Sequence, residues 1–200
     1  MASLSFNPRK MRTTEDGKIL WSYSQLKHSF PEFLESPIIE IIKGNLYMSP
    51  SRSIKHQRIL RRLIKLLEAF FEEKPVAELF IAPVDVILSE NDVVIPDLFI
   101  ILDRHKDSIK ITNVEGVPDF VIEILSKNVK QDTEIKKALY AKYGVEEYWV
   151  VDQFDELIIR FNSPVEGKYI DKQIYKTTDL ITSVVFKDFI FRIEDLFGNL

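Results

Sequence analysis

Hydrophobic residues recur along the chain at two spacings, and the spacing predicts which segments are helices. Apolar residues three or four positions apart indicate an amphipathic helix that buries one face. The predicted helices are 53–71 and 131–143, a short helix that begins at Ser22 or Ser24 and ends near Phe30, and a last turn at 193–197. Gly144 directly follows the second long pattern, which is typical of a helix C-terminus.

Shorter apolar runs, bounded by turn residues, predict the strands. These strands are 38–42, 46–48, 79–88, 93–102, 120–125, 148–152, 157–161, 169–175 and 184–191. Hairpin turns are expected at 43–45, 89–92 and 153–156. Antiparallel hairpins therefore occur together with one strand–helix–strand unit, which favours an α/β domain on a mixed β-sheet.

Length and charge narrow the class of protein. The 200 residues, 46% of them hydrophobic, suffice for one packed domain, which we expect at 16–200 behind a loosely held N-terminal arm of residues 1–15. No apolar run approaches the ~18 residues needed to span a bilayer, so a membrane protein is not expected. The net charge of −4 excludes a uniformly basic nucleic-acid coat, although a local basic patch remains open.

Cysteine is absent from the sequence. Its absence excludes disulfides, thiolate metal sites and cysteine nucleophiles, and it fits a reducing cytoplasm. The three histidines are scattered, and no glycine spacing matches a phosphate-binding loop. The candidate chemistry therefore depends on carboxylates and lysines.

Two acidic residues interrupt otherwise apolar strands. Asp97 lies within 93–102 and Glu123 within 120–125. Continuously apolar strands are usually buried on both faces, where an ionised carboxylate costs several kcal/mol unless it is compensated. Two carboxylates brought together repel unless a cation lies between them, and hard oxygen ligands suit Mg²⁺ or Mn²⁺. The alternative is that each acid lies at a strand end or on a wet face.

A polar row follows on the next helix. Asp132, Lys136 and Tyr140 are four residues apart, so they share one helix face. Lys136 would then reach a site at the end of the strand that carries Glu123. The alternative is an ordinary salt bridge between Asp132 and Lys136, worth only ~0.3–0.5 kcal/mol. Spacing alone leaves both interpretations open.

The first long helix carries a basic face without any acid. Its cations are Arg52, Lys55, Arg58, Arg61, Arg62 and Lys65, and His56 lies among them. Such a face would follow a phosphate backbone, or it is simply a solvated surface.

An ordered set of motifs covers residues 20–195. It consists of Glu40 with Lys43-Gly44-Asn45-Leu46, Ser49-Pro50, His56, Ile95-Pro96-Asp97-Leu98, 116–126, Asp132-x-x-x-Lys136-x-x-x-Tyr140 and 144–152. With these motifs in this order, the sequence resembles the Uma-two family, a restriction endonuclease-like group within the PD-(D/E)xK nuclease superfamily.

The resemblance implies a restriction endonuclease-like core and metal-dependent hydrolysis of DNA phosphodiester bonds. It implies that Asp97 and Glu123 are the catalytic acids and hold Mg²⁺ or Mn²⁺. Glu40 or His56 would supply the upstream motif position. DNA is the implied partner, and a homodimer would allow two strands to be cut.

The position of the superfamily lysine departs from the pattern. Leu125 stands two residues after Glu123, where that lysine is expected. The resemblance assigns its role to Lys136 on the following helix, with Lys127 and Lys130 as rivals. Supporting roles fall to Asp132, which would orient Lys136, and to Tyr140.

Contacts to the DNA backbone are expected from the basic helix and the loop before 131–143. The residues assigned to them are Arg52, Lys55, Arg58, Lys127 and Lys130. The alternatives are an inactive nuclease fold that binds nucleic acid or serves in assembly, and a structural homo-oligomer.

Overall fold

The computed structural model describes residues 12–15, 18–29, 39–48, 52–126 and 130–198. Its helical elements are α1 (Tyr23–Ser29), α2 (Ile54–Glu73), the 3-10 helix η3 (Asp103–Ser108), the π-helical segment η4 (Gln131–Lys136), α3 (Lys137–Tyr143) and α4 (Ile193–Phe197). Most of the predicted arm at 1–15 lies outside the described residues. Among those described, no helix is both long and apolar enough to cross a membrane.

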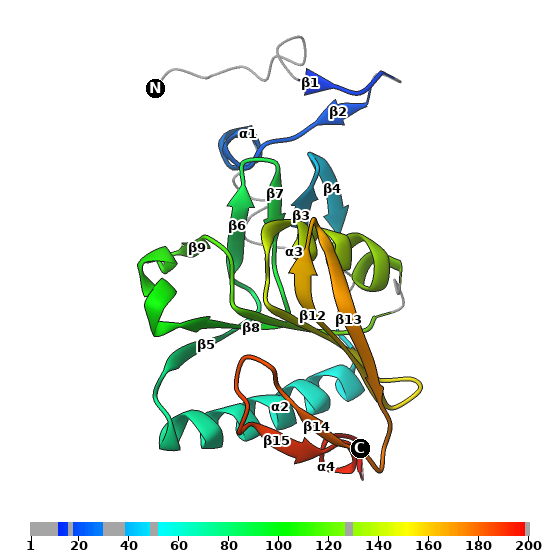
Figure 1. The fold of residues 1–200 in the computed structure, drawn as a ribbon. Helices are drawn as coiled ribbons and strands as arrows, with labels where there is room; N and C mark the ends of the chain where they lie inside the picture. Colours follow the sequence, from blue (N-terminus) through cyan, green and yellow to red (C-terminus); the bar gives the residue numbers. More distant parts are fainter. Residues whose placement is uncertain (1–11, 16–17, 30–38, 49–51, 127–129, 199–200) are drawn as a thin grey trace.

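Within these residues two larger sheets carry most of the strands (Figure 1). The six-stranded sheet has the order β13 (Lys168–Tyr175), β12 (Leu157–Val165), β11 (Glu147–Asp152), β10 (Phe120–Ile124), β8 (Leu98–Leu102), β5 (Ala77–Ile81). The five-stranded sheet has the order β4 (Asn45–Met48), β3 (Ile39–Ile42), β7 (Asp92–Val94), β6 (Asp85–Ser89), β9 (Asn113–Glu115). Small pairs are formed by β1 (Arg12–Thr13) with β2 (Ile19–Leu20), and by β14 (Leu180–Thr182) with β15 (Ile190–Arg192).

Both larger sheets are mixed, whereas the sequence predicted a single mixed sheet. In the six-stranded sheet β10 pairs in parallel with β11, and the η4–α3 crossover connects these two strands. All other neighbouring strands of this sheet pair antiparallel. In the five-stranded sheet β6 pairs in parallel with β9. The predicted α/β class with a mixed sheet, flanking helices and additional antiparallel strands is therefore confirmed.

Local capping explains where the helices begin and end. Ser22 caps α1 and exchanges hydrogen bonds with Gln25, so Ser22 rather than Ser24 is the cap. Ser53 caps α2 by accepting a bond from the amide of His56. Gly144 ends α3 with φ of 84°, a left-handed conformation that glycine adopts without strain. The expected end of the first helix at Phe30 lies outside the described residues.

Two predicted strands are each divided by a proline. The run 79–88 forms β5 and β6, separated at Pro83, and the run 93–102 forms β7 and β8, separated at Pro96. Proline has no amide hydrogen for a sheet ladder, so it interrupts the pairing. The predicted turn at 89–92 is confirmed, and it joins β6 to β7 in the five-stranded sheet. The strands on the far side of the two prolines, β5 and β8, pair with each other in the six-stranded sheet.

The six-stranded sheet is covered on both faces. The long helix α2 and the C-terminal β14, β15 and α4 lie on one face, and α3 lies on the other (Figure 1). Along β10 the side chains alternate, so that Ile122 packs in the cluster with α2 and Val121 in the cluster with α3. Glu123 therefore points toward η4 and α3.

The predicted strand 184–191 is confirmed only at 190–191, which belong to β15, and is wrong for 184–189. Residues 183–189 form the turn between β14 and β15. The buried carboxylate of Glu147 accepts hydrogen bonds from the Ser183 hydroxyl (2.6 Å) and from the amides of Val184 (2.8 Å) and Val185 (3.0 Å). Because these amides donate to the side chain of Glu147, they are not available for hydrogen bonds to a neighbouring strand.

We expect Glu147→Gln to lower the free energy of unfolding by about 1–3 kcal/mol, because the amide replaces one acceptor by a donor facing other donors. Urea unfolding checks the stability, and hydrogen exchange checks the β14–β15 turn. The control is Glu146→Gln, since that neighbouring side chain is exposed. Equal stability of the two variants would contradict a role for Glu147 in holding this turn.

Candidate active site

Strand pairing brings the two strand-embedded acids together. In the antiparallel register of β8 and β10, Ile122 pairs with Leu98, so the next pair along is Glu123 with Asp97. The Asp97 amide donates to Glu123 Oε2 at 3.4 Å, and the Ile124 amide donates to Asp97 Oδ2 at 2.9 Å. Asp97 and Glu123 are therefore held side by side, just past the break at Pro96.

Asp97 is paired with His56, in the first turn of α2, and with Arg52, which precedes that helix. Its Oδ2 lies 3.0 Å from His56 Nε2, and its Oδ1 lies 2.8 Å from Arg52 Nη2. Burial by itself would raise the pKa of Asp97, but the hydrogen bond with His56 and the charge of Arg52 outweigh it. The pKa of Asp97 therefore lies below its usual value, and the carboxylate is ionised.

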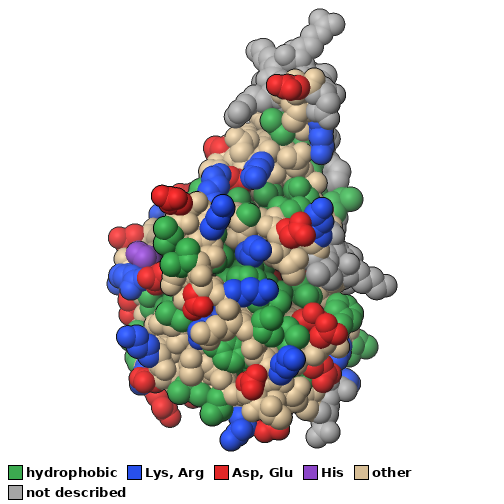
Figure 2. Space-filling model, turned by 45° about the vertical axis from the view of Figure 1, so that its right-hand side comes forward, with side chains coloured by type: hydrophobic (Ala, Val, Ile, Leu, Met, Phe, Trp, Pro, Cys, Tyr) green, Lys and Arg blue, Asp and Glu red, His purple; other side chains and the backbone are tan. Residues whose placement is uncertain are grey.

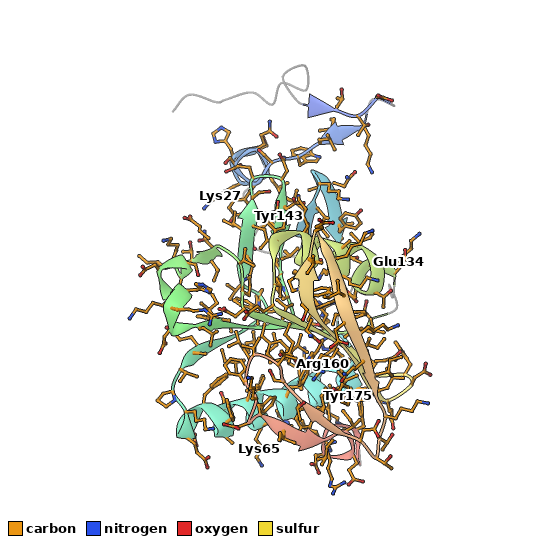
Figure 3. All side chains as sticks on the ribbon, in the orientation of Figure 1. Lys27, Lys65, Glu134, Tyr143, Arg160 and Tyr175 are labelled. Atoms are coloured by element: carbon orange, nitrogen blue, oxygen red, sulfur yellow. The ribbon has the colours of Figure 1, made fainter. Side chains whose placement is uncertain are left out.

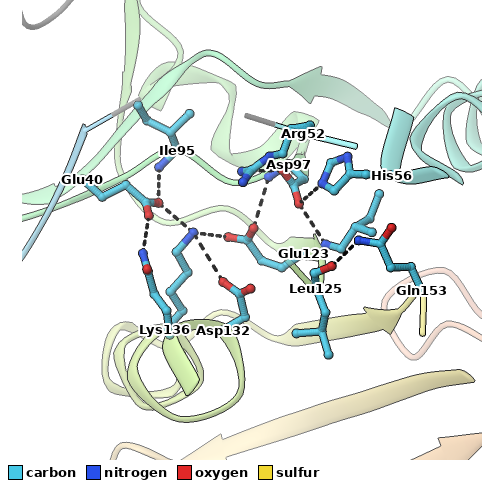
Figure 4. A network of polar contacts seen from close by, with 12 residues as sticks. Glu40, Arg52, His56, Ile95, Asp97, Glu123, Leu125, Asp132, Lys136 and Gln153 are labelled. Carbon is cyan, nitrogen blue, oxygen red and sulfur yellow. Dashed lines mark hydrogen bonds and ion pairs between the residues drawn. The ribbon is translucent and has the colours of Figure 1, made fainter. Parts of the chain in front are cut away.

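Glu123 faces the polar row of the following helix. Its Oε1 accepts from Lys136 Nζ at 2.8 Å (Figure 4). The same oxygen also accepts from the Tyr140 hydroxyl at 2.9 Å. The same Lys136 Nζ lies 2.7 Å from Glu40 Oε1 and 3.9 Å from Asp132 Oδ1. The predicted salt bridge between Asp132 and Lys136 thus exists, but Lys136 is buried at the centre of a larger cluster.

Glu40 anchors this cluster from β3. It accepts hydrogen bonds from the Ile95 amide at 2.9 Å and from Gln131 Nε2 at 2.8 Å, besides its ion pair with Lys136. Gln131 and Lys136 are the first and last residues of η4. π-Helical turns inside helices are frequent at functional sites, and this one presents both side chains to Glu40.

The cluster holds more acids than permanent cations. Among its described members four carboxyl groups face two permanent cations, Arg52 and Lys136, which leaves an excess of two carboxyls. Burial raises the pKa of Glu123 to about 8, with Lys136 opposing the rise and neighbouring acids adding to it. Burial likewise raises the pKa of Asp132 to about 6.

The surrounding carboxylates stabilise the protonated, charged form of Lys136. Burial would lower the pKa of Lys136, but the carboxylates of Glu123, Glu40 and Asp132 together raise it above its usual value. Burial is the main reason why the pKa of Glu123 stays raised, because the ammonium of Lys136 offsets only part of that effect.

The donor set fits a hydrated divalent ion better than a closed metal site. No group of three or more His, Cys, Asp or Glu side chains in the described part of the chain is arranged to hold a metal. Two carboxylate oxygens nevertheless keep accepting capacity: Asp97 Oδ1, which contacts Arg52, and Glu123 Oε2, which has one long contact. Mg²⁺ often uses one or two carboxylates and completes its shell with water and phosphate, and a dication would balance the excess of two carboxyls.

Sequence reasoning missed several partners in the site. It assigned Arg52 to the DNA backbone, whereas Arg52 lies half-buried against Asp97. Gln153, in the turn after β11, bridges Ser53 Oγ and the Leu125 carbonyl. Glutamines carry no charge or spacing signal, so no feature of the pattern distinguishes Gln131 or Gln153 from a surface residue.

The proposed DNA-contacting residues are less organised. Lys55 pairs with Glu156 at 2.8 Å, and the exposed Lys130 lies 3.9 Å from Glu134, which projects outward from η4 (Figure 3). Arg58 is exposed, and Lys127 lies outside the described residues. Figure 2 shows Lys and Arg interspersed with Asp and Glu over the face in view rather than gathered in one patch. Of the two rival lysines, Lys130 is thus not in the cluster.

Comparisons with known proteins agree with this fold. A solved structure of "a putative nuclease belonging to DUF820" from Anabaena variabilis ATCC 29413 matches with a TM-score of 0.67 and 20% sequence identity, covering 84% of this chain and 96% of that one. No protein with a curated function matches the sequence. The Uma2 family model, described as "Putative restriction endonuclease", matches residues 23–194. Because this match spans most of the sequence, the chain belongs to the Uma2 family.

Proposed function

We propose that the protein is an endonuclease that hydrolyses DNA phosphodiester bonds with Mg²⁺, or Mn²⁺, held by Asp97 and Glu123. The observation that carries this proposal is the buried pair of neighbouring carboxylates, each with one oxygen still able to accept, beside the ammonium of Lys136. Membership of the restriction endonuclease-like family supports the reaction class.

Each residue has a distinct part in this mechanism. When bound, the divalent ion would act as a Lewis acid that activates water and neutralises charge on the phosphate. Lys136 uses two of its three N–H donors on Glu40 and Glu123, which leaves one for the phosphate or the attacking water. His56 holds Asp97, and Tyr140 holds Glu123, so both carboxylates keep their orientation.

Glu40 positions Lys136 rather than the substrate. Its Oε2 accepts from Gln131, and its Oε1 accepts from the Ile95 amide as well as pairing with Lys136, so the carboxylate is fixed in place beside the ammonium. Asp132 lies at the edge of the cluster, with its side chain 10% exposed, where it would tune the field around Lys136.

A second candidate function has one observation in its favour. Asp97 and Glu123 already have protein cations as partners, so the cluster is held together without a metal. A nuclease fold that binds nucleic acid without turnover would need nothing more.

Cleavage of supercoiled plasmid separates the two candidates. We expect the wild type to convert it to nicked or linear forms with Mg²⁺ or Mn²⁺, and this activity to disappear with EDTA or in Asp97→Asn, because a neutral amide is a poor ligand for a hard dication. The matched control is Asp103→Asn, an exposed residue of η3. DNA binding by the wild type without cleavage under any cation would favour the binding-only function.

A further inference from the structure

Arg52 occupies one of the two open carboxylate oxygens in the site. Asp97 Oδ2 is saturated by His56 and the Ile124 amide, whereas Oδ1 contacts Arg52 at 2.8 Å. A ligand that bridges Asp97 to Glu123 must therefore approach the oxygen that Arg52 holds. Arg52 and such a ligand compete for the same atom.

Arg52 is also placed to move. Its side chain is 14% exposed, against 2% for Asp97 and for Lys136, so it lies at the solvent side of the cluster. It precedes the cap Ser53, which leaves its backbone outside the hydrogen-bonded turns of α2. Burial would lower the pKa of Arg52, but the surrounding acids raise it, so the guanidinium stays charged wherever it lies.

Resting on the proposed function, we propose that Arg52 is a displaceable counter-ion that alternates between Asp97 and a phosphate of the DNA backbone. Without metal it neutralises Asp97. With the dication in place, Arg52 leaves Oδ1, and its planar fork binds phosphate oxygens, which it matches in geometry.

This exchange couples the binding of metal to the binding of DNA. Displaced into water, Arg52 loses the pairing with Asp97, which weakens metal binding to the free protein. A nearby phosphate restores a partner for the guanidinium, so DNA strengthens metal binding, and by reciprocity metal strengthens DNA binding. The protein without DNA therefore binds the metal ion less tightly than the protein with DNA does.

Arg52→Met tests the competition, because methionine keeps much of the length and removes the charge. We expect Mg²⁺ or Mn²⁺ to bind the free variant about five- to tenfold more tightly than the wild type, measured by isothermal calorimetry and by the metal-induced rise in melting temperature. Arg61→Met, an exposed arginine of α2, is the control and should leave metal affinity unchanged. Unchanged or weaker metal binding by Arg52→Met overturns the proposal.

The second arm measures binding of a short phosphorothioate DNA duplex by fluorescence anisotropy. With metal present, Arg52→Met should bind the duplex about tenfold more weakly, and added metal should no longer improve its DNA affinity. A wild-type response to metal in this variant overturns the proposal. Arg52→Lys, which retains a charge, provides the second variant if Arg52→Met fails to fold, and it should keep part of the coupling.

The outcomes distinguish this inference from the proposed function. If neither the wild type nor Arg52→Met binds Mg²⁺ or Mn²⁺, the metal site and the exchange both fail. Tighter metal binding and weaker DNA binding by Arg52→Met, without plasmid cleavage by the wild type, support the exchange and contradict the endonuclease.

Discussion

Lys136→Met is expected to lower the free energy of unfolding by about 3–5 kcal/mol, the usual cost of removing one partner from a buried ion pair. Lys136 is 2% exposed and lies within 2.8 Å of oxygens from both Glu40 and Glu123, so its loss leaves two buried carboxyls without a cation. Urea or thermal unfolding of the purified variant measures the loss. Plasmid cleavage should also fall below detection.

A double variant separates charge from packing in this result. Glu40→Gln with Lys136→Met should recover part of the lost stability, because one unpaired carboxylate is removed together with the ammonium. Lys130→Met is the matched control, since Lys130 is exposed and its contact with Glu134 is long, and its effect should stay within about 1 kcal/mol. A Lys136→Met protein as stable as this control would show that the folded cluster does not need the charge.

Glu123→Gln should reduce the rate of DNA cleavage about a thousandfold or more, which corresponds to the several kcal/mol that metal-assisted charge stabilisation supplies. Glutamine keeps the size of the side chain and can still accept from Lys136 and Tyr140, so the fold should survive. The measurement is the initial rate of plasmid nicking at saturating Mg²⁺, accompanied by circular dichroism to verify folding.

Glu134→Gln is the control for that experiment. Glu134 belongs to the same π-helical segment as Lys136 but projects away from the cluster into solvent (Figure 3). Wild-type rates are expected for it. If Glu123→Gln cleaves as fast as Glu134→Gln, then Glu123 has no part in the reaction, and the proposed metal site is wrong.

Local signals were sufficient for the longer helices and for most turns, although the 3-10 helix η3 was not predicted. The apolar spacing of 53–71 and the serine before it predicted α2, and Gly144 marked the end of α3, because capping and amphipathicity act within one or two helical turns. Strand limits were less predictable, since Pro83 and Pro96 divide runs that look continuous by hydrophobicity alone. The turn at 183–189 depends on Glu147, which is distant in sequence.

The acids of the candidate site were identifiable because they are charged residues within otherwise apolar strands. A carboxylate within an apolar strand needs a partner, so Asp97 and Glu123 could be selected without any coordinates. The spacing of Lys136 and Tyr140 then suggested which helix face would meet Glu123. The partners of Asp97 could not be chosen in this way, because Arg52 lies in a run of similar basic residues.

The main helices, the mixed α/β class and the need to neutralise Asp97 and Glu123 could be predicted from the sequence alone, because hydrophobic periodicity and a charge within an apolar run are local properties of the chain. Only the tertiary structure decided which cations meet those acids, with Lys136 between Glu40 and Glu123 and Arg52 on Asp97. Such pairings join residues from β3, β10 and η4, and join Arg52, which precedes α2, to Asp97, which precedes β8. Their geometry is set by sheet register and helix packing, which no local pattern contains.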